Sequence, residues 1–193
     1  MAKKHNNIFL IGPMGSGKTT IGKKLANKVS KKFYDSDDEI KKNTGADIPL
    51  IFEIEGDSGF RVREKKVISE LVLLDNIVLS TGGGTILDNE NRSMLVENGF
   101  IIYLKSSAER IYKRTSGDKS RPLLQVSDRL GRIKEILAER ESIYKSLELM
   151  DMIKRYNHYF LKYNWFLSLV VINQYLNLIF SFFVIFLLHK FSY

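Results

Sequence analysis

A glycine-rich loop near the start of the chain constrains the fold more than any other feature. The loop Gly12–Thr19, with the sequence Gly-Pro-Met-Gly-Ser-Gly-Lys-Thr, follows the short apolar run Ile8–Ile11 and precedes apolar residues at helical spacing, Ile21, Leu25 and Val29. This order predicts a strand, a glycine loop and a helix. Backbone N–H groups of such a loop surround phosphate oxygens at a helix N-terminus. The sequence therefore predicts a phosphate-binding P-loop, with an ordinary glycine turn as the alternative.

Short apolar runs and charged helical stretches alternate along the next part of the chain. The further runs are Phe33–Tyr34, Ile77–Leu79 and Phe100–Leu104. This alternation predicts an α/β protein with a parallel, doubly wound sheet. The polar segments after the first three runs are Gly12–Thr20, Asp35–Asp37 and Gly82–Gly84. Because ligands bind at the carboxyl ends of parallel strands, we expect these three segments to meet in one cleft.

Composition excludes several classes of protein. A chain of 193 residues with 44% hydrophobic and 27% charged residues predicts one globular domain with an appendage. The net charge of +8 comes from scattered residues, so we expect no nucleic-acid partner. Zero cysteines exclude a disulfide framework and a thiolate metal site. Together with the polar, basic segment Met1–Asn7, this favours a cytoplasmic location.

Two aspartates and three glycines occupy the predicted ligand edge. Asp35 and Asp37 alternate on an extended segment and share one face. One carboxylate there can hold a water of Mg²⁺ while the other orients a substrate hydroxyl or accepts its proton. An acidic helix cap is the alternative. Gly82, Gly83 and Gly84 let the backbone approach a small ligand closely, or form a flexible turn.

Arginines supply the positive charge that the predicted site needs. Arg61 and Arg140 can each form a bidentate pair with a substrate carboxylate, or a surface ion pair. Arg121 lies in the polar segment Arg114–Leu124, which we expect to be a lid that brings positive charge over the phosphates, with a plain loop as the alternative. The segment Ser127–Lys145 then predicts an amphipathic helix capped by its first residue.

Taken together and in this order, these segments resemble the shikimate kinase family. The resemblance rests on Gly12–Thr20, Phe33-Tyr34-Asp35-Ser36-Asp37, Gly56-Asp57-Ser58-Gly59-Phe60-Arg61-Val62-Arg63-Glu64, Gly82-Gly83-Gly84, Arg121-Pro122-Leu123-Leu124, and Arg140 with Tyr144. The combination is far more specific than the P-loop, which many families share. It implies a three-layer P-loop kinase fold with a central parallel sheet and a lid region.

The resemblance also implies the reaction and its residues. ATP would phosphorylate the 3-hydroxyl of shikimate, giving ADP and shikimate 3-phosphate, in a cytoplasmic enzyme that we expect to be a monomer. The implied nucleotide-binding residues are Gly15, Ser16, Gly17, Lys18, Thr19, Thr20, Arg114 and Arg121. The implied shikimate-binding residues are Asp37, Arg61, Gly82, Gly83, Gly84 and Arg140. Lys18, Asp37 and Arg121 would be catalytic, and Mg²⁺ would be held by Thr19 and, through water, by Asp35.

The resemblance ends after about residue 146. We expect a kinase-like domain over residues 1–146 and an atypical apolar tail over 147–193, without the family's last strand and adenine-side arginine. Residues 165–188 are long and apolar enough for a transmembrane helix, while the tail's Asn-, Ile- and Phe-rich composition suggests an out-of-frame translation. Two alternatives follow: a membrane-tethered or inactive nucleotide-binding protein, and a kinase of another small hydroxylated acid, for example gluconate. Asp57, where the family usually has Glu, is a minor departure.

Overall fold

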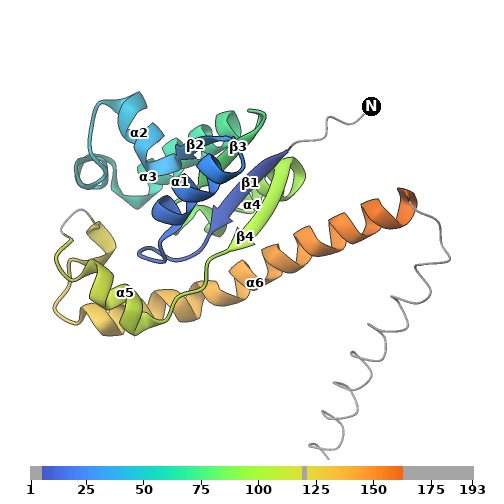
Figure 1. Cartoon of the computed structure of the whole chain (residues 1–193). Helices are drawn as coiled ribbons and strands as arrows, with labels where there is room; N and C mark the ends of the chain where they lie inside the picture. The colour runs from blue at the N-terminus through green and yellow to red at the C-terminus, as the bar shows by residue number, and fades with distance from the viewer. Residues whose placement is uncertain (1–5, 119–120, 163–193) are drawn as a thin grey trace, which may run out of the picture. The chain divides into compact units, whose positions relative to one another are not determined.

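The computed structural model describes residues 6–118 and 121–162 (Figure 1). In chain order the elements are β1 (Asn7–Ile11), α1 (Lys18–Lys28), β2 (Lys32–Asp35), α2 (Ser36–Thr44), α3 (Ile48–Leu71), β3 (Ile77–Ser80), the 3₁₀ helix η1 (Thr85–Leu87), α4 (Asn89–Asn98), β4 (Gly99–Tyr103), α5 (Ala108–Thr115), the 3₁₀ helix η2 (Pro122–Leu124) and α6 (Arg129–Lys162). The chain divides into two compact units, Met1–Asp151 and Met152–Tyr193.

The sheet confirms the predicted parallel topology. In the described residues it has four strands in the order β2-β3-β1-β4, and every neighbouring pair is parallel. All four apolar runs of the sequence coincide with strands to within two residues. The chain turns from β1 to one side of the sheet for β2 and later crosses to the other side for β4. The loop after β1 therefore starts at the switch point of the sheet, where ligands bind in such folds.

Helices cover both faces of the sheet. Successive strand residues point to opposite faces, so apolar strand residues are buried against helices on each side. Phe9, Ile11 and Leu79 belong to a buried cluster shared with α3 and α4. Leu10 and Val78, one residue away on the same strands, pack in another cluster with Ala26 of α1. The fold thus has three layers, as the sequence predicts.

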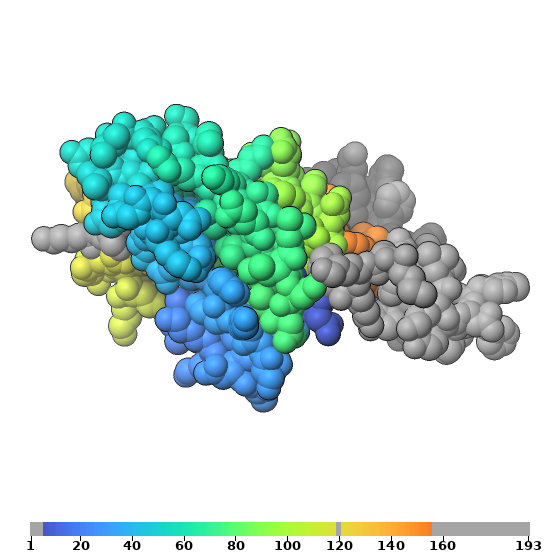
Figure 2. Space-filling model, turned by 90° about the horizontal axis from the view of Figure 1, so that it is seen from above, coloured from blue at the N-terminus to red at the C-terminus, as the bar shows by residue number. Residues whose placement is uncertain are grey.

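Helices α2 and α3 lie together on the domain. The space-filling view shows their light-blue to turquoise atoms as one continuous block beside the blue atoms of α1 (Figure 2). Asp35 caps α2 by accepting a hydrogen bond from the Asp37 N–H at 3.1 Å. Helix α3 is interrupted at Gly56, whose φ of 69° and ψ of −174° are not helical. Residues of α3 on both sides of this break line the predicted ligand edge, Ile48 and Phe52 before it and Arg61 and Glu64 after it.

Helix α6 differs from the prediction at both ends. Its cap is Asp128 rather than Ser127: an oxygen of the Asp128 carboxylate accepts a hydrogen bond from the Gly131 N–H at 2.8 Å. The helix continues to Lys162, well past Lys145. No strand follows β4 in the part of the chain that the structure describes.

The possible membrane helix at residues 165–188 lies outside the described residues. Among residues 6–118 and 121–162, no helix has the length and apolar character needed to cross a bilayer.

Candidate active site

A cleft of about 590 Å³ opens at the carboxyl edge of the sheet. It brings together all but one of the residues that the sequence predicts for the site: Gly15, Gly17, Lys18, Thr19, Thr20, Asp35, Asp37, Arg61, Gly82, Gly83, Gly84, Arg114, Arg121 and Arg140. The exception is Ser16, which is buried and is not among the lining residues. Six segments that are far apart in the sequence therefore share one cavity.

The loop between β1 and α1 depends on backbone conformations that glycine adopts readily. Gly12 has a φ of 143°, and a Cβ there would lie 2.6 Å from the carbonyl oxygen of Leu104. Gly17, which precedes the first residue of α1, has a φ of 98°. Side chains at either position would be strained, so these glycines are required for the loop to hold its shape. Its position at the N-terminus of α1 suits a bound phosphate.

Lys18 is buried at the start of α1. Its Nζ atom donates hydrogen bonds to the carbonyl oxygens of Gly12 at 2.7 Å and Pro13 at 2.9 Å. Burial lowers the pKa of Lys18 from 10.5 to about 8, and the nearby carboxylates of Asp37 and Asp35 oppose this decrease. The loop thus holds the ammonium group in place, and its N–H groups could equally donate to phosphate oxygens.

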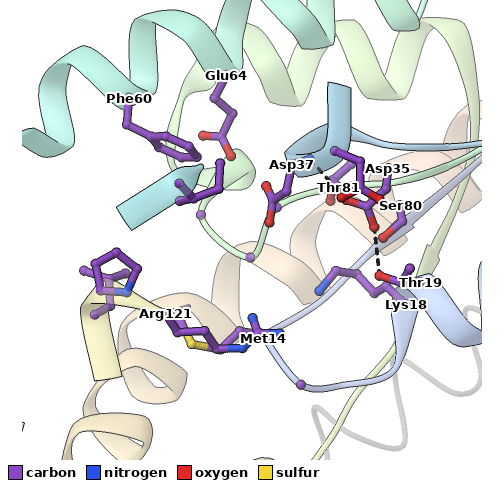
Figure 3. A pocket seen from close by; sticks show the side chains of 18 of the residues that line it. Met14, Lys18, Thr19, Asp35, Asp37, Phe60, Glu64, Ser80, Thr81 and Arg121 are labelled. Atoms are coloured by element: carbon purple, nitrogen blue, oxygen red, sulfur yellow. Dashed lines mark hydrogen bonds between the residues drawn. The ribbon is translucent and has the colours of Figure 1, made fainter. Parts of the chain in front are cut away.

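The two predicted aspartates have different environments. The Asp35 carboxylate accepts a hydrogen bond from the Thr19 hydroxyl at 2.8 Å, which joins the end of β2 to the first turn of α1. Asp37 and Lys18 extend from different elements into the same cavity (Figure 3). Burial, followed by the negative charges of Asp35 and Glu64, raises the pKa of Asp37 from 3.8 to about 6. Asp37 is therefore a carboxylate at neutral pH but a more basic one than usual.

The glycine triplet allows side chains of α3 to approach the backbone. A Cβ on Gly82 would lie 2.6 Å from Oε1 of Glu64 and 3.1 Å from Oδ1 of Asp37. A Cβ on Gly84 would lie 2.5 Å from Nη1 of Arg61. The triplet is therefore closely approached by side chains of the protein itself, and close approach of a ligand to it stays a prediction.

Glu64 is the most important site residue that sequence reasoning left without a role. Its side chain is 1% exposed, one oxygen accepts from Arg61 Nη1 at 2.7 Å, and the other accepts from the Thr85 hydroxyl at 2.7 Å. Asp57 contacts the same guanidinium, with Arg61 Nη2 and Oδ1 3.1 Å apart, so the shorter acid still reaches it. The spacing of three residues between Arg61 and Glu64 on a helix is the one signal in the sequence for this pairing.

Arg140 and Tyr144 reach the triplet from α6. The Arg140 Nη1 atom and the Tyr144 hydroxyl both donate to the carbonyl oxygen of Gly83, at 3.3 Å and 2.6 Å. Both side chains are buried, and the ring of Tyr144 stacks on Tyr103 at the end of β4 with a centroid distance of 4.9 Å. Burial raises the pKa of Tyr144, so its hydroxyl stays a donor. The resemblance includes Tyr144, but no pattern in the sequence predicts its hydrogen bond to the Gly83 carbonyl oxygen.

Two further arginines line the nucleotide side of the cleft. Arg114, near the end of α5, donates from Nη1 to the carbonyl oxygens of Gly15 and Ser16 at 3.1 Å and 3.2 Å. Arg121 precedes η2 and pairs through Nε with the Asp118 carboxylate at 2.7 Å. Both positive charges therefore lie beside the loop that is expected to hold phosphate groups.

A three-layer parallel sheet with a P-loop at its switch point, carboxylates across from the loop lysine and four arginines around the cleft defines a P-loop kinase of a small molecule. A profile of the shikimate kinase family matches residues 14–158, well over half of the chain. The chain belongs to the shikimate kinase family.

Relatives and solved structures agree with this assignment. The shikimate kinase of Nitrosococcus oceani is 56% identical over 147 residues, which are 76% of each chain. That of Legionella pneumophila strain Paris is 53% identical over 144 residues, or 75% of this chain and 82% of the relative. The structure of shikimate kinase from Acinetobacter baumannii in complex with shikimate matches with a TM-score of 0.73 and 40% identity, over 82% of this chain and 94% of that one. Shikimate kinase from Bacteroides thetaiotaomicron matches with a TM-score of 0.68 and 31% identity, over 72% and 82%.

Proposed function

We propose that the protein transfers the γ-phosphoryl group of ATP to the 3-hydroxyl of shikimate, which gives shikimate 3-phosphate and ADP. One observation carries this proposal: a single cleft holds the P-loop lysine Lys18, the basic carboxylate Asp37, and the arginines Arg61 and Arg140. Phosphoryl transfer requires mainly positioning and charge stabilisation, and these four side chains supply both.

The arginine pair suits an acceptor that carries a carboxylate. Arg61 and Arg140 come from different helices and both line the cleft. In each guanidinium the Nε atom is buried and makes no hydrogen bond within the described residues. Arg140 Nε lies 3.9 Å from a carboxylate oxygen of Glu139, beyond hydrogen-bond distance, so both guanidiniums keep a donor that is not hydrogen-bonded and an anionic group that engages them would be stabilised. Among small hydroxylated acceptors, this favours an acid such as shikimate over a neutral sugar.

Asp37 is suited to act on the acceptor hydroxyl. Its pKa of about 6 leaves it ionised at the pH of the cell yet more basic than an ordinary aspartate. A general base works best with a pKa close to the working pH. In this role Asp37 orients the hydroxyl toward the phosphate and takes its proton as the new P–O bond forms.

Lys18 and Arg121 are suited to stabilise charge on the transferred group. Lys18 donates hydrogen bonds to the carbonyl oxygens of Gly12 and Pro13 in this structure, and phosphate oxygens of bound ATP would replace these acceptors. Arg121, the residue before η2, also lines the cleft. Positive groups fixed where negative charge develops lower the barrier most in a site that excludes water.

We also propose that Mg²⁺ accompanies ATP. The Thr19 hydroxyl and the Asp35 carboxylate lie 2.8 Å apart next to the P-loop, an oxygen donor set that fits this ion. The described residues contain no cluster of three or more acidic, histidine or cysteine side chains able to hold a metal alone. This agrees with Mg²⁺ chemistry, in which one carboxylate and the substrate phosphates share the ion. When bound, Mg²⁺ would neutralise phosphate charge.

An acceptor panel tests the proposal. The full-length protein with Mg²⁺ and ATP is offered shikimate, shikimate methyl ester and gluconate, and products are followed by ³¹P NMR. We expect shikimate 3-phosphate from shikimate, with little product from the ester, because the ester has no carboxylate for Arg61 and Arg140. Equal phosphorylation of the acid and its ester would contradict the assigned arginine role, and gluconate as the preferred acceptor would contradict the proposed substrate.

The cytoplasmic location, the monomeric state and the division into residues 1–146 and 147–193 also belong to the proposal. Buried Leu147 and Asp151 support a domain that includes at least the beginning of the second segment. Sedimentation velocity of the purified chain tests the monomer. Cell fractionation tests the location: recovery with the membranes would favour the tethered alternative.

A further inference from the structure

Arg129, the first residue of α6, connects two segments that carry cleft arginines. Its Nη1 atom donates to the carbonyl oxygens of Thr115 at 2.5 Å and Ser116 at 2.9 Å, at the end of α5. Its Nε atom donates to the carbonyl oxygen of Leu124 at 3.0 Å, the last residue of η2. One guanidinium thus joins two chain segments through three backbone contacts, while the residue itself does not line the cleft.

The first segment touches the P-loop. Thr115 is 1% exposed, and a Cβ built on Gly15 would lie 3.0 Å from its Cγ2 atom. Arg114, the preceding residue, donates to the carbonyl oxygen of Gly15. The last carbonyl groups of a helix lack partners within the helix. The Thr115 carbonyl accepts from the Asp118 N–H at 3.0 Å, and Arg129 adds a second donor to it and a donor to the Ser116 carbonyl. It therefore fixes the end of α5 where that end meets the phosphate loop.

The second segment carries Arg121. The Leu124 N–H donates to the carbonyl oxygen of Arg121 at 3.0 Å, so the acceptor of Arg129 and the backbone of Arg121 belong to the same turn. Leu124 is fully buried in a cluster with Ile111 of α5 and Ile133 of α6. The turn is thus attached to the same two helices by packing and by the Arg129 guanidinium.

We propose that Arg129 is a positioning residue for nucleotide binding: it fixes the end of α5 and the η2 turn at one separation, and thereby sets Arg114 and Arg121 around the P-loop. The planar fork of arginine suits this role because Nε and Nη1 can donate in two directions at once, which a lysine ammonium cannot reproduce in the same geometry. The inference rests on the proposed function only in taking ATP as the phosphoryl donor.

The test measures binding rather than turnover. The full-length protein, R129Q, R129K and the control R132Q are titrated with the non-hydrolysable ATP analogue AMP-PNP in Mg²⁺, and separately with shikimate, by isothermal calorimetry. Arg132 lies one turn further along α6, and its Nη1 atom pairs with the exposed Glu135 at 3.0 Å, so R132Q removes a charge of the same sign with no contact to either segment. Thermal melting of each protein checks that it is folded.

We expect R129Q to bind AMP-PNP about tenfold more weakly than the original protein, equivalent to about 1.4 kcal/mol. Its affinity for shikimate should stay within about twofold of the original value. R132Q should bind both ligands within about twofold of the original protein. R129K should fall between R129Q and the original protein, and it serves as the test if R129Q does not fold. Original AMP-PNP affinity in folded R129Q or R129K, or an equal loss of both ligands, would overturn the proposal. Failure of the original protein to bind shikimate would contradict the proposed function while leaving the AMP-PNP comparison intact.

Discussion

Replacing Asp37 with Asn should stabilise the protein while removing its activity. The cause is the raised pKa of Asp37, which burial and the charges of Asp35 and Glu64 move from 3.8 to about 6. Below pH 3.8 the carboxyl is neutral in both the folded and the unfolded state. Between pH 3.8 and about 6 the folded state keeps its proton while the unfolded state loses it, so the free energy of unfolding falls as the pH rises. Above about pH 6 the full penalty is present.

The shift from 3.8 to about 6 corresponds to about 3 kcal/mol, which is an upper limit because Asp37 lines a cleft that solvent can enter. Asn keeps the shape of the side chain and has no charge to bury. Urea denaturation at pH 7.5 should therefore give D37N a midpoint up to about 1.5 M higher, for a slope of about 2 kcal/mol/M. At pH 4 the two midpoints should converge. Activity should fall by about 10²-fold or more, as expected when a general base is lost.

Asp38→Asn is the matched control. Asp38 is 56% exposed and pairs with the exposed Lys41, so its removal should change stability by less than about 0.5 kcal/mol at either pH. A D37N protein that is no more stable than the original at pH 7.5, or a difference between the two that does not depend on pH, would refute the reasoning.

Three further predictions concern the same cleft. Gly84→Ala should raise the KM for shikimate about tenfold and lower the melting temperature while leaving the KM for ATP nearly unchanged, because the new Cβ displaces the Arg61 guanidinium from the buried Glu64 carboxylate; steady-state kinetics and a thermal melt check both. Tyr144→Phe should lose about 1 kcal/mol of stability and raise the KM for shikimate, because the Gly83 carbonyl loses its 2.6 Å donor; urea denaturation and kinetics measure these, with Tyr103→Phe as the control. The pKa of Lys18, lowered to about 8, predicts that kcat/KM for ATP falls as the pH rises through about 8, since the ammonium form is lost; a flat profile from pH 7 to 9.5 would contradict this.

The fold was accessible from the sequence because its signals are local. Each strand is a short apolar run, the P-loop requires a strand before it and a helix after it, and the glycines mark where other groups approach the backbone closely. Helix ends were less accessible. Ser127 and Asp128 are both good caps in adjacent positions, and the carboxylate geometry selects Asp128. The chain has neither Gly nor Pro after Leu147, so nothing in the sequence stops α6 at Lys145.

The candidate site was accessible only in part, because some of its contacts join distant residues. Residue type and order along the chain predict the P-loop, Asp37 and the arginines. The buried pairing of Glu64 with Thr85, the contact of Tyr144 with Gly83 and the bridging role of Arg129 depend on tertiary structure, and no local pattern predicts them. These residues support the groups that would meet the ligands, and their importance appears only when the helices are packed on the sheet.

The most direct test of the central claim is shikimate-dependent formation of ADP by the purified full-length chain with Mg²⁺ and ATP. The account predicts that shikimate increases ADP release many-fold over the rate with ATP alone, and that Arg61→Ala abolishes most of this increase without preventing AMP-PNP binding. A folded protein that binds AMP-PNP but forms ADP at the same rate with and without shikimate would contradict it.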